Sequence, residues 1–113
     1  MVIRIKWDVE EAIALFDLYF TLPDDSDLKE KKIAELSKIY NNRARILGLE
    51  VDEKFRNKAG IKMQLACIQY VVTNGKYGLS DASELFYQTH KLYKEYPQMF
   101  HLILHEFYRK YSF

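Results

Sequence analysis

Residues 52–83 read DEKFRNKAGIKMQLACIQYVVTNGKYGLSDAS, and this stretch decides the fold. Its middle part, 59–72, is the most continuously apolar segment of the chain. Asn57 is a natural N-cap for it and a glycine turn follows it, so the pattern predicts a helix over about 58–73. A helix that is apolar on nearly all sides belongs in the centre of a bundle. We therefore expect the other helices to enclose this third helix.

Two helices are predicted before this stretch. Asp8 is a good N-cap and precedes an apolar stripe of helical period, which predicts a helix over about 9–21. After a loop that contains proline, Ser26 or Asp27 caps a second helix that runs to about Leu47. A glycine follows directly and supplies the expected stop signal.

Two further helices are predicted after it. Ser80 is the expected N-cap of the fourth helix, and Pro97 suits the first position of the fifth. The expected fold class is all-α, a single compact bundle of about five helices with the third one central. The expected organisation is one domain over 1–113, with a short arm at 1–7, a three-helix unit resembling a helix-turn-helix at 8–73 and a C-terminal helical hairpin at 79–112.

The composition is that of a protein with an ordinary apolar core. Hydrophobic residues make up 49% of the chain, so a core can form without disulfides or metal. The single cysteine, Cys67, lies inside the apolar stretch and fits a core thiol in a reducing compartment. The amino terminus lacks the apolar region of a signal peptide, and no apolar run approaches the roughly 20 residues that span a bilayer. We expect a cytoplasmic protein without a membrane partner.

No motif in the sequence indicates a reaction. Cys67 has apolar neighbours rather than a base that would activate it. His101 and His105 have the i, i+4 spacing that can hold zinc, but His90 is the only other histidine, and the glutamate of the metalloprotease motif is missing. We therefore expect a non-catalytic protein without a metal site or another cofactor.

The net charge of +1 conceals an uneven distribution of charge. Residues 1–28 contain two basic and seven acidic side chains, whereas residues 29–76 contain eleven basic and five acidic ones. Residues 77–113 are balanced, with four of each. The basic middle third can attract an anionic partner. The alternative is that the acidic first helix simply packs beside the basic middle of the chain.

Two sets of short motifs extend over most of the chain. Trp7-Asp8-Val9-Glu10-Glu11-Ala12, followed by Leu36-Ser37-Lys38-Ile39, looks like the opening of a Myb/SANT-like three-helix unit. A longer set consists of Leu36-Ser37, Arg43-Ala44, Gly48, Asp52, Phe55-Arg56-Asn57, Gly60-Ile61, Met63-Gln64-Leu65, Gly78-Leu79-Ser80 and Ala82-Ser83. This longer set resembles the helical amino-terminal domain of bacterial HNH-type restriction endonucleases and related defence-associated proteins.

The resemblance covers about residues 7–95 and implies a module that recognises or targets DNA, linked to restriction or phage defence. It does not imply nuclease activity, because the chain has no HNH catalytic segment. The chain also departs from the Myb pattern. Its second helix is longer, its third is more apolar, and two more helices follow.

A DNA-binding surface is expected at the start of the third predicted helix and on the second. Lys and Arg neutralise phosphates, while Asn, Gln and Arg pair with base edges. The candidate residues are Arg56, Asn57, Lys58, Lys62 and Gln64, with Lys38, Arg43 and Arg45. The alternative is structural, with Asn57 capping the third helix and Arg56 bridging to an acidic residue of the first.

A second hypothesis is a protein-interaction module, such as an adaptor, an inhibitor or a self-associating domain. The last two predicted helices contain more aromatic residues than a small core needs, and exposed aromatic residues mark interfaces. These residues are Tyr87, Tyr93, Tyr96, Tyr108, Tyr111 and Phe113. The expected partner is another protein or a second copy of the chain, bound through these two helices.

Overall fold

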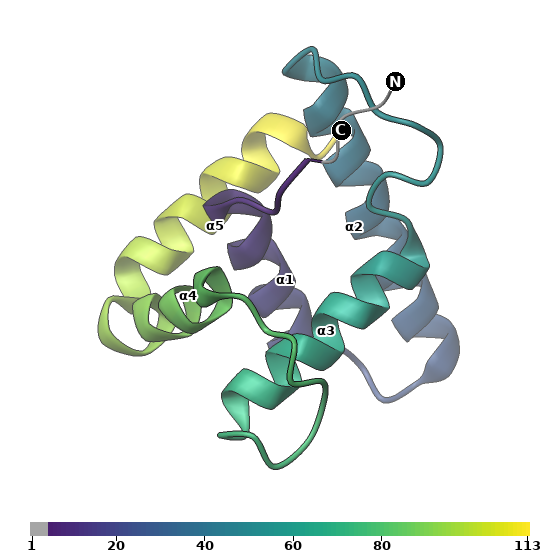
Figure 1. The fold of residues 1–113 in the computed structure, drawn as a ribbon. Helices are drawn as coiled ribbons and strands as arrows, with labels where there is room; N and C mark the ends of the chain where they lie inside the picture. The colour runs from purple at the N-terminus through teal and green to yellow at the C-terminus, as the bar shows by residue number, and fades with distance from the viewer. Residues whose placement is uncertain (1–4) are drawn as a thin grey trace.

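The computed structural model describes residues 5–113, and within them the protein is a single all-α bundle. The first part of the predicted arm at 1–7 lies outside the described residues, and residues 5–7 precede the first helix without regular structure. Figure 1 shows the arrangement of the helices. They are α1 (Val9–Thr21), α2 (Ser26–Ile46), α3 (Lys58–Val72), α4 (Glu84–Glu95) and α5 (Pro97–Tyr111).

The sequence signals for helix ends are confirmed at most positions. Asp8 caps α1 in a complete capping box with Glu11, in which each side chain accepts a hydrogen bond from the other residue's backbone N–H. Asn57 caps α3 by accepting a hydrogen bond from the backbone N–H of Gly60. Asp25, rather than Ser26 or Asp27, caps α2. The predicted ends of α2 and α3 are each one residue too long.

The predicted start of α4 is wrong by a few residues. Ser80 does not cap this helix, which begins at Glu84 after Ser83. The segment before it lies against α3 instead, because the backbone N–H of Leu79 donates a hydrogen bond to the carbonyl of Ala66 at 3.0 Å. These residues are held in an irregular conformation by α3, so the helix starts only beyond them.

The central helix is α1, and the expectation that α3 is central is wrong. Among the described residues, α1 is the only helix that packs against all four others, whereas α3 packs against α1, α2 and α4. Figure 1 shows α1 in the middle of the bundle. The run from Ala12 to Phe16 is fully buried, while Met63 of α3 is 58% exposed. Ala12 and Ala14, two residues apart, are both fully buried, so α1 is covered on more than one side.

Aromatic side chains fill the space around α1. Phe16 packs edge-on against Phe86 of α4 and parallel to the ring of His90. On the α2 side, the hydroxyl of Tyr40 donates a 2.6 Å hydrogen bond to the main-chain carbonyl of Glu11. Burial is the main reason why the pKa of Tyr40 lies well above its ordinary value. These contacts tie α2 and α4 to the central helix.

No helix of the described residues has the length and apolarity that crossing a bilayer requires.

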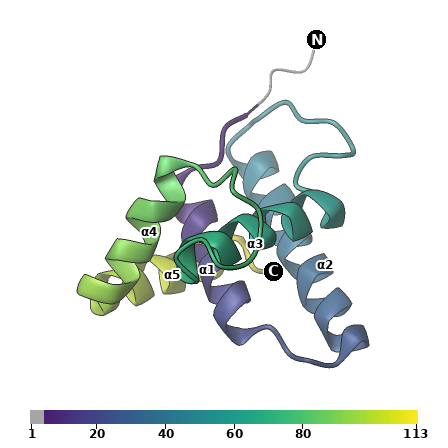
Figure 2. The ribbon, with the colours of Figure 1, turned by 60° about the horizontal axis from the view of Figure 1, so that its bottom comes forward.

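Figure 2 shows that the chain entering α1 and the loop between α2 and α3 run together at one end of the bundle. Arg43 and Arg56, two of the residues that the sequence nominates for DNA binding, contact Asp8 and Glu11 at this end.

Cys67 lies in the core and is 4% exposed. Burial raises the pKa of its thiol, so the reactive thiolate is scarce at neutral pH. We expect a thiol-specific reagent to modify Cys67 about a hundredfold or more slowly in the folded protein than in denaturant, because access needs local opening. Stopped-flow absorbance of the released chromophore measures both rates. Similar rates in the two conditions would show that this face of α3 is open.

Candidate nucleic-acid interface

Arg56, the leading candidate for a DNA contact, is enclosed within the protein. Its side chain is 8% exposed and that of Glu11 is 2% exposed. The guanidinium forms a two-pronged ion pair, with Nε 2.6 Å from Glu11 Oε2 and Nη2 3.0 Å from Oε1. It also lies 3.8 Å from the ring centre of Trp7. An arginine that is paired, stacked and this deeply buried is not a surface contact for a nucleic acid.

The same Nη2 of Arg56 also contacts the backbone that enters α1. Nη2 donates to the carbonyls of Ile5 and Lys6, each at 3.2 Å. The backbone of Arg56 is held as well, because Ser37 of α2 donates its hydroxyl to the Arg56 carbonyl at 2.8 Å. Arg56 thereby joins three segments: the amino-terminal segment, α2 and the loop before α3. The alternative in which Arg56 bridges to an acidic residue of the first helix is therefore confirmed.

Arg43, a second candidate, is also engaged by acidic residues of the first helix and its cap. Its Nη2 lies 2.7 Å from Asp8 Oδ2 and 3.5 Å from Glu10 Oε1, and the side chain is 11% exposed. The guanidinium lies 5.7 Å from the ring centre of Tyr111. Burial is the largest single influence on the pKa of Arg43 and acts to lower it. The nearby carboxylates, Asp8 first among them, act in the opposite direction, and the pKa is raised overall. Arg43 and Arg56 together offset two of the three negative charges of Asp8, Glu10 and Glu11 at the start of α1.

The electrostatic environment of Glu11 shows how closely this end is packed. Burial is the largest influence and raises the pKa of Glu11 above its ordinary value. The hydrogen bond and the positive charge of Arg56 act in the opposite direction. Since a buried carboxylate without a partner is costly, Glu11 depends on Arg56 to remain charged.

Two of the candidates for base contacts are placed unfavourably. Asn57 uses its side-chain oxygen to cap α3, at 2.8 Å from the backbone nitrogen of Gly60. Gln64 is half-buried and follows Lys62 by two residues. Side chains two residues apart do not share a face of a helix. The structure therefore does not bring Gln64 together with the lysines of α3.

Lys58 and Lys62 do lie together at an exposed surface. Their side chains are 53% and 49% exposed, and both reach Glu30 of α2, at 3.3 Å and 2.5 Å respectively. The hydrogen bond from Lys62 is the first cause of the lowered pKa of Glu30, with a further contribution from Lys58. One carboxylate thus faces two ammonium groups, which leaves a local excess of positive charge.

Lys38 and Arg45, the last two candidates, are exposed on α2. They follow Lys31 at successive intervals of seven residues, so the three side chains share one stripe of the helix. Arg45 donates a hydrogen bond to the side-chain oxygen of Asn42 at 3.1 Å. Lys31 was not among the candidate contacts, although its spacing from Lys38 already indicates a common face.

The comparisons with known proteins identify no relative. No protein-family model, curated protein or solved structure matches this chain.

The aromatic residues of α4 and α5 divide into two groups. Tyr93, Tyr108 and Tyr111 face the core, and Tyr108 donates a hydrogen bond to Asp17 at 3.3 Å. Tyr87, Tyr96 and Phe113 are 43%, 63% and 68% exposed.

The described residues contain no group of three or more His, Cys, Asp or Glu side chains arranged to hold a metal ion.

Proposed function

We propose that this chain is a non-catalytic nucleic-acid-binding module that contacts the phosphates of DNA through exposed basic side chains of α2 and α3. The observation that carries the proposal is the shared exposed position of Lys58 and Lys62 at the start of α3. Lys38 and Arg45 are two further exposed cations, on α2. The proposal agrees with the helix-turn-helix-like character expected of the first three helices, and with the resemblance to the amino-terminal domain of HNH-type restriction endonucleases, which implies a link to restriction or phage defence.

The remaining contacts favour binding to the backbone over reading of the sequence. Of two residues with the chemistry to pair with bases, Arg56 is paired inside the protein, and Asn57 is exposed but uses its side-chain oxygen to cap α3. Lysine is a point charge that neutralises phosphates and carries little sequence information. The proposed module therefore binds DNA with little sequence preference and with affinity that depends strongly on salt.

Fluorescence anisotropy with short labelled duplexes of unrelated sequence tests the proposal. We expect the logarithm of the affinity to fall linearly with the logarithm of salt concentration between about 50 and 200 mM. The double variant Lys58→Ala, Lys62→Ala should lower the affinity by about tenfold or more and reduce the salt slope by about 2, because each lost phosphate contact removes about 0.9 from the slope.

A double variant with the same change of charge is the control. Lys91 and Arg109 each pair with a carboxylate on their own helix, as the lysines of α3 pair with Glu30. Replacing both by alanine should leave binding near the wild-type value. A flat titration of the wild type at low salt would overturn the proposal. An equal loss in the control would assign the effect to net charge rather than to this surface.

A protein-interaction module is the second candidate, and one surface feature favours it. Tyr96, Met99 and Leu102 are 63%, 52% and 58% exposed and line one open groove at the turn between α4 and α5. Exposed apolar side chains that adjoin one another mark contact sites. Three side chains cover much less than the roughly 800 Å² per partner of a standard interface, so this candidate ranks second.

A further inference from the structure

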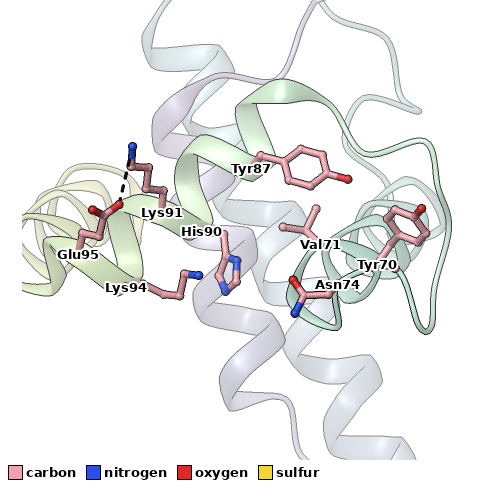
Figure 3. A pocket seen from close by; sticks show the side chains of 9 residues that line it. Tyr70, Val71, Asn74, Tyr87, His90, Lys91, Lys94 and Glu95 are labelled. Carbon is pink, nitrogen blue, oxygen red and sulfur yellow. Dashed lines mark ion pairs between the residues drawn. The ribbon is translucent and has the colours of Figure 1, made fainter.

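A pocket between the carboxyl end of α3 and the outer side of α4 is separate from the basic surface at the start of α3. Its volume is about 620 Å³, which lies within the range of small-molecule sites. Figure 3 shows its side chains. The α3 side contributes Tyr70, Val71 and Asn74, and the α4 side contributes Tyr87, His90, Lys91, Lys94 and Glu95.

Three polar side chains meet on one side of this pocket. Figure 3 shows Lys94 extending toward the ring of His90, with the carboxamide of Asn74 on the other side of that ring. Among the described residues, none of these three side chains has a hydrogen-bond or ion-pair partner. An ammonium group, an imidazole and a carboxamide together offer the positive charge and the N–H donors that bind a phosphate.

The position of His90 is determined by the core. Its ring stacks on Phe16 of α1, with the ring centres 6.0 Å apart and the planes 17° from parallel. The imidazole is therefore held in place before any ligand binds. A group held in this way loses little conformational freedom on binding, which favours affinity.

The other side of the pocket is aromatic. Tyr87 is 43% exposed and projects from α4 toward the α3 side, where Tyr70 lies (Figure 3). The ring of Tyr70 lies against Gly75, where an added Cβ would come within 3.3 Å of it. Gly75 has a positive φ of 85°, so the turn that supports this ring favours glycine. Exposed tyrosine rings beside cationic groups suit a planar, anionic ligand.

We propose that this pocket binds a phosphate ester joined to a planar ring, which is the chemistry of a nucleotide. Lys94, His90 and Asn74 contact the phosphate, and the base stacks on Tyr87. Lys91 takes no part, because its ammonium is 3.9 Å from Glu95 and points away from His90 in Figure 3. The proposal goes beyond nucleic-acid binding by α2 and α3 and does not depend on it.

Isothermal titration calorimetry with four probes tests the proposal: adenosine 5′-monophosphate, adenosine, inorganic phosphate and a short oligonucleotide with a 5′-phosphate. We expect the nucleotide to bind about tenfold or more tightly than adenosine or phosphate alone, because only it makes both sets of contacts. Tight binding of the oligonucleotide would identify the end of a nucleic acid as the source of the ligand. Binding of the mononucleotide alone would identify a free nucleotide.

Single variants assign the contacts. Lys94→Ala should weaken binding of the nucleotide by about tenfold, whereas Lys91→Ala, with the same loss of charge on the same helix, should leave it unchanged. Tyr87→Ala should weaken binding of both the nucleotide and adenosine, and Tyr87→Phe should restore it. Absence of nucleotide binding at millimolar concentration, or equal effects of the two lysine variants, would overturn the proposal whether or not the protein binds duplex DNA.

Discussion

Replacing Arg56 by methionine should lower the free energy of unfolding at pH 7 by about 3–5 kcal/mol, because it leaves a buried carboxylate without its partner. Glu11 is 2% exposed and would lose two hydrogen bonds from the guanidinium. The same variant also frees the carbonyls of Ile5 and Lys6 from their donor. Chemical denaturation followed by circular dichroism measures the loss.

The effect of this substitution should depend on pH. Burial already raises the pKa of Glu11, and Arg56 is the main influence that lowers it, so the pKa rises further in the variant. A carboxyl group whose pKa is higher in the folded than in the unfolded state favours folding as pH falls toward its unfolded value. The difference in stability between variant and wild type should therefore shrink as pH falls from 7 toward 5.

A matched substitution separates this structural effect from a DNA contact. Lys62→Met removes a cation from an exposed pair with Glu30, and such surface pairs contribute little to stability. We expect the stability of this variant to remain close to that of the wild type. If Arg56→Met were equally harmless to folding and instead abolished binding to DNA, our assignment of Arg56 to the core would be wrong.

Replacing Gly78 by alanine should lower the free energy of unfolding by about 3 kcal/mol, through a clash with the backbone added to an unfavourable φ. Gly78 has a φ of 94°, and a Cβ built on it would lie 2.3 Å from the carbonyl oxygen of Ala66 and 2.7 Å from the backbone nitrogen of Tyr70. These atoms belong to α3 and cannot move aside as a flexible side chain would. Thermal and chemical denaturation measure the effect.

Gly48→Ala is the control for this prediction. Gly48 also has a positive φ, of 71°, but an added Cβ would meet nothing within 4 Å. Its replacement should lower the free energy of unfolding by only about 1–2 kcal/mol, which is the conformational cost alone. Equal losses at the two positions would show that the loop before α4 is not pressed against α3.

The helices were largely predictable because their signals are local. Asp8 and Asn57 were recognised as N-caps from the residues that follow them, and both cap their helices. The start of α4 was not predictable in this way. Ser80 has the right chemistry for a cap, but the contact of this segment with α3 places it outside the helix. At this position the contact with α3 outweighs the local capping signal of Ser80.

The candidate site was only partly predictable for the same reason. Lys58 and Lys62 lie one helical turn apart, so their common face follows from helical geometry. Arg56 is 45 residues from Glu11 in sequence, and no periodic pattern relates the two residues. The sequence analysis did name a bridge from Arg56 to the first helix, but it left this open beside DNA binding. The pocket between α3 and α4 was not predicted, because Asn74 and Lys94 come to line one pocket only after folding.

By itself, the sequence determined the all-α class, the helices and most of their caps, because periodicity and capping act over a few residues. Only the tertiary structure decided which helix is central. Both α1 and α3 are strongly apolar. Among the described residues, all four other helices pack against α1, whereas three pack against α3. Residues 52–83 supply one wall of the bundle, and the first two turns of α3 leave Lys58 and Lys62 exposed while the preceding Arg56 is buried against α1. That division depends on how the helices pack, which no local pattern encodes.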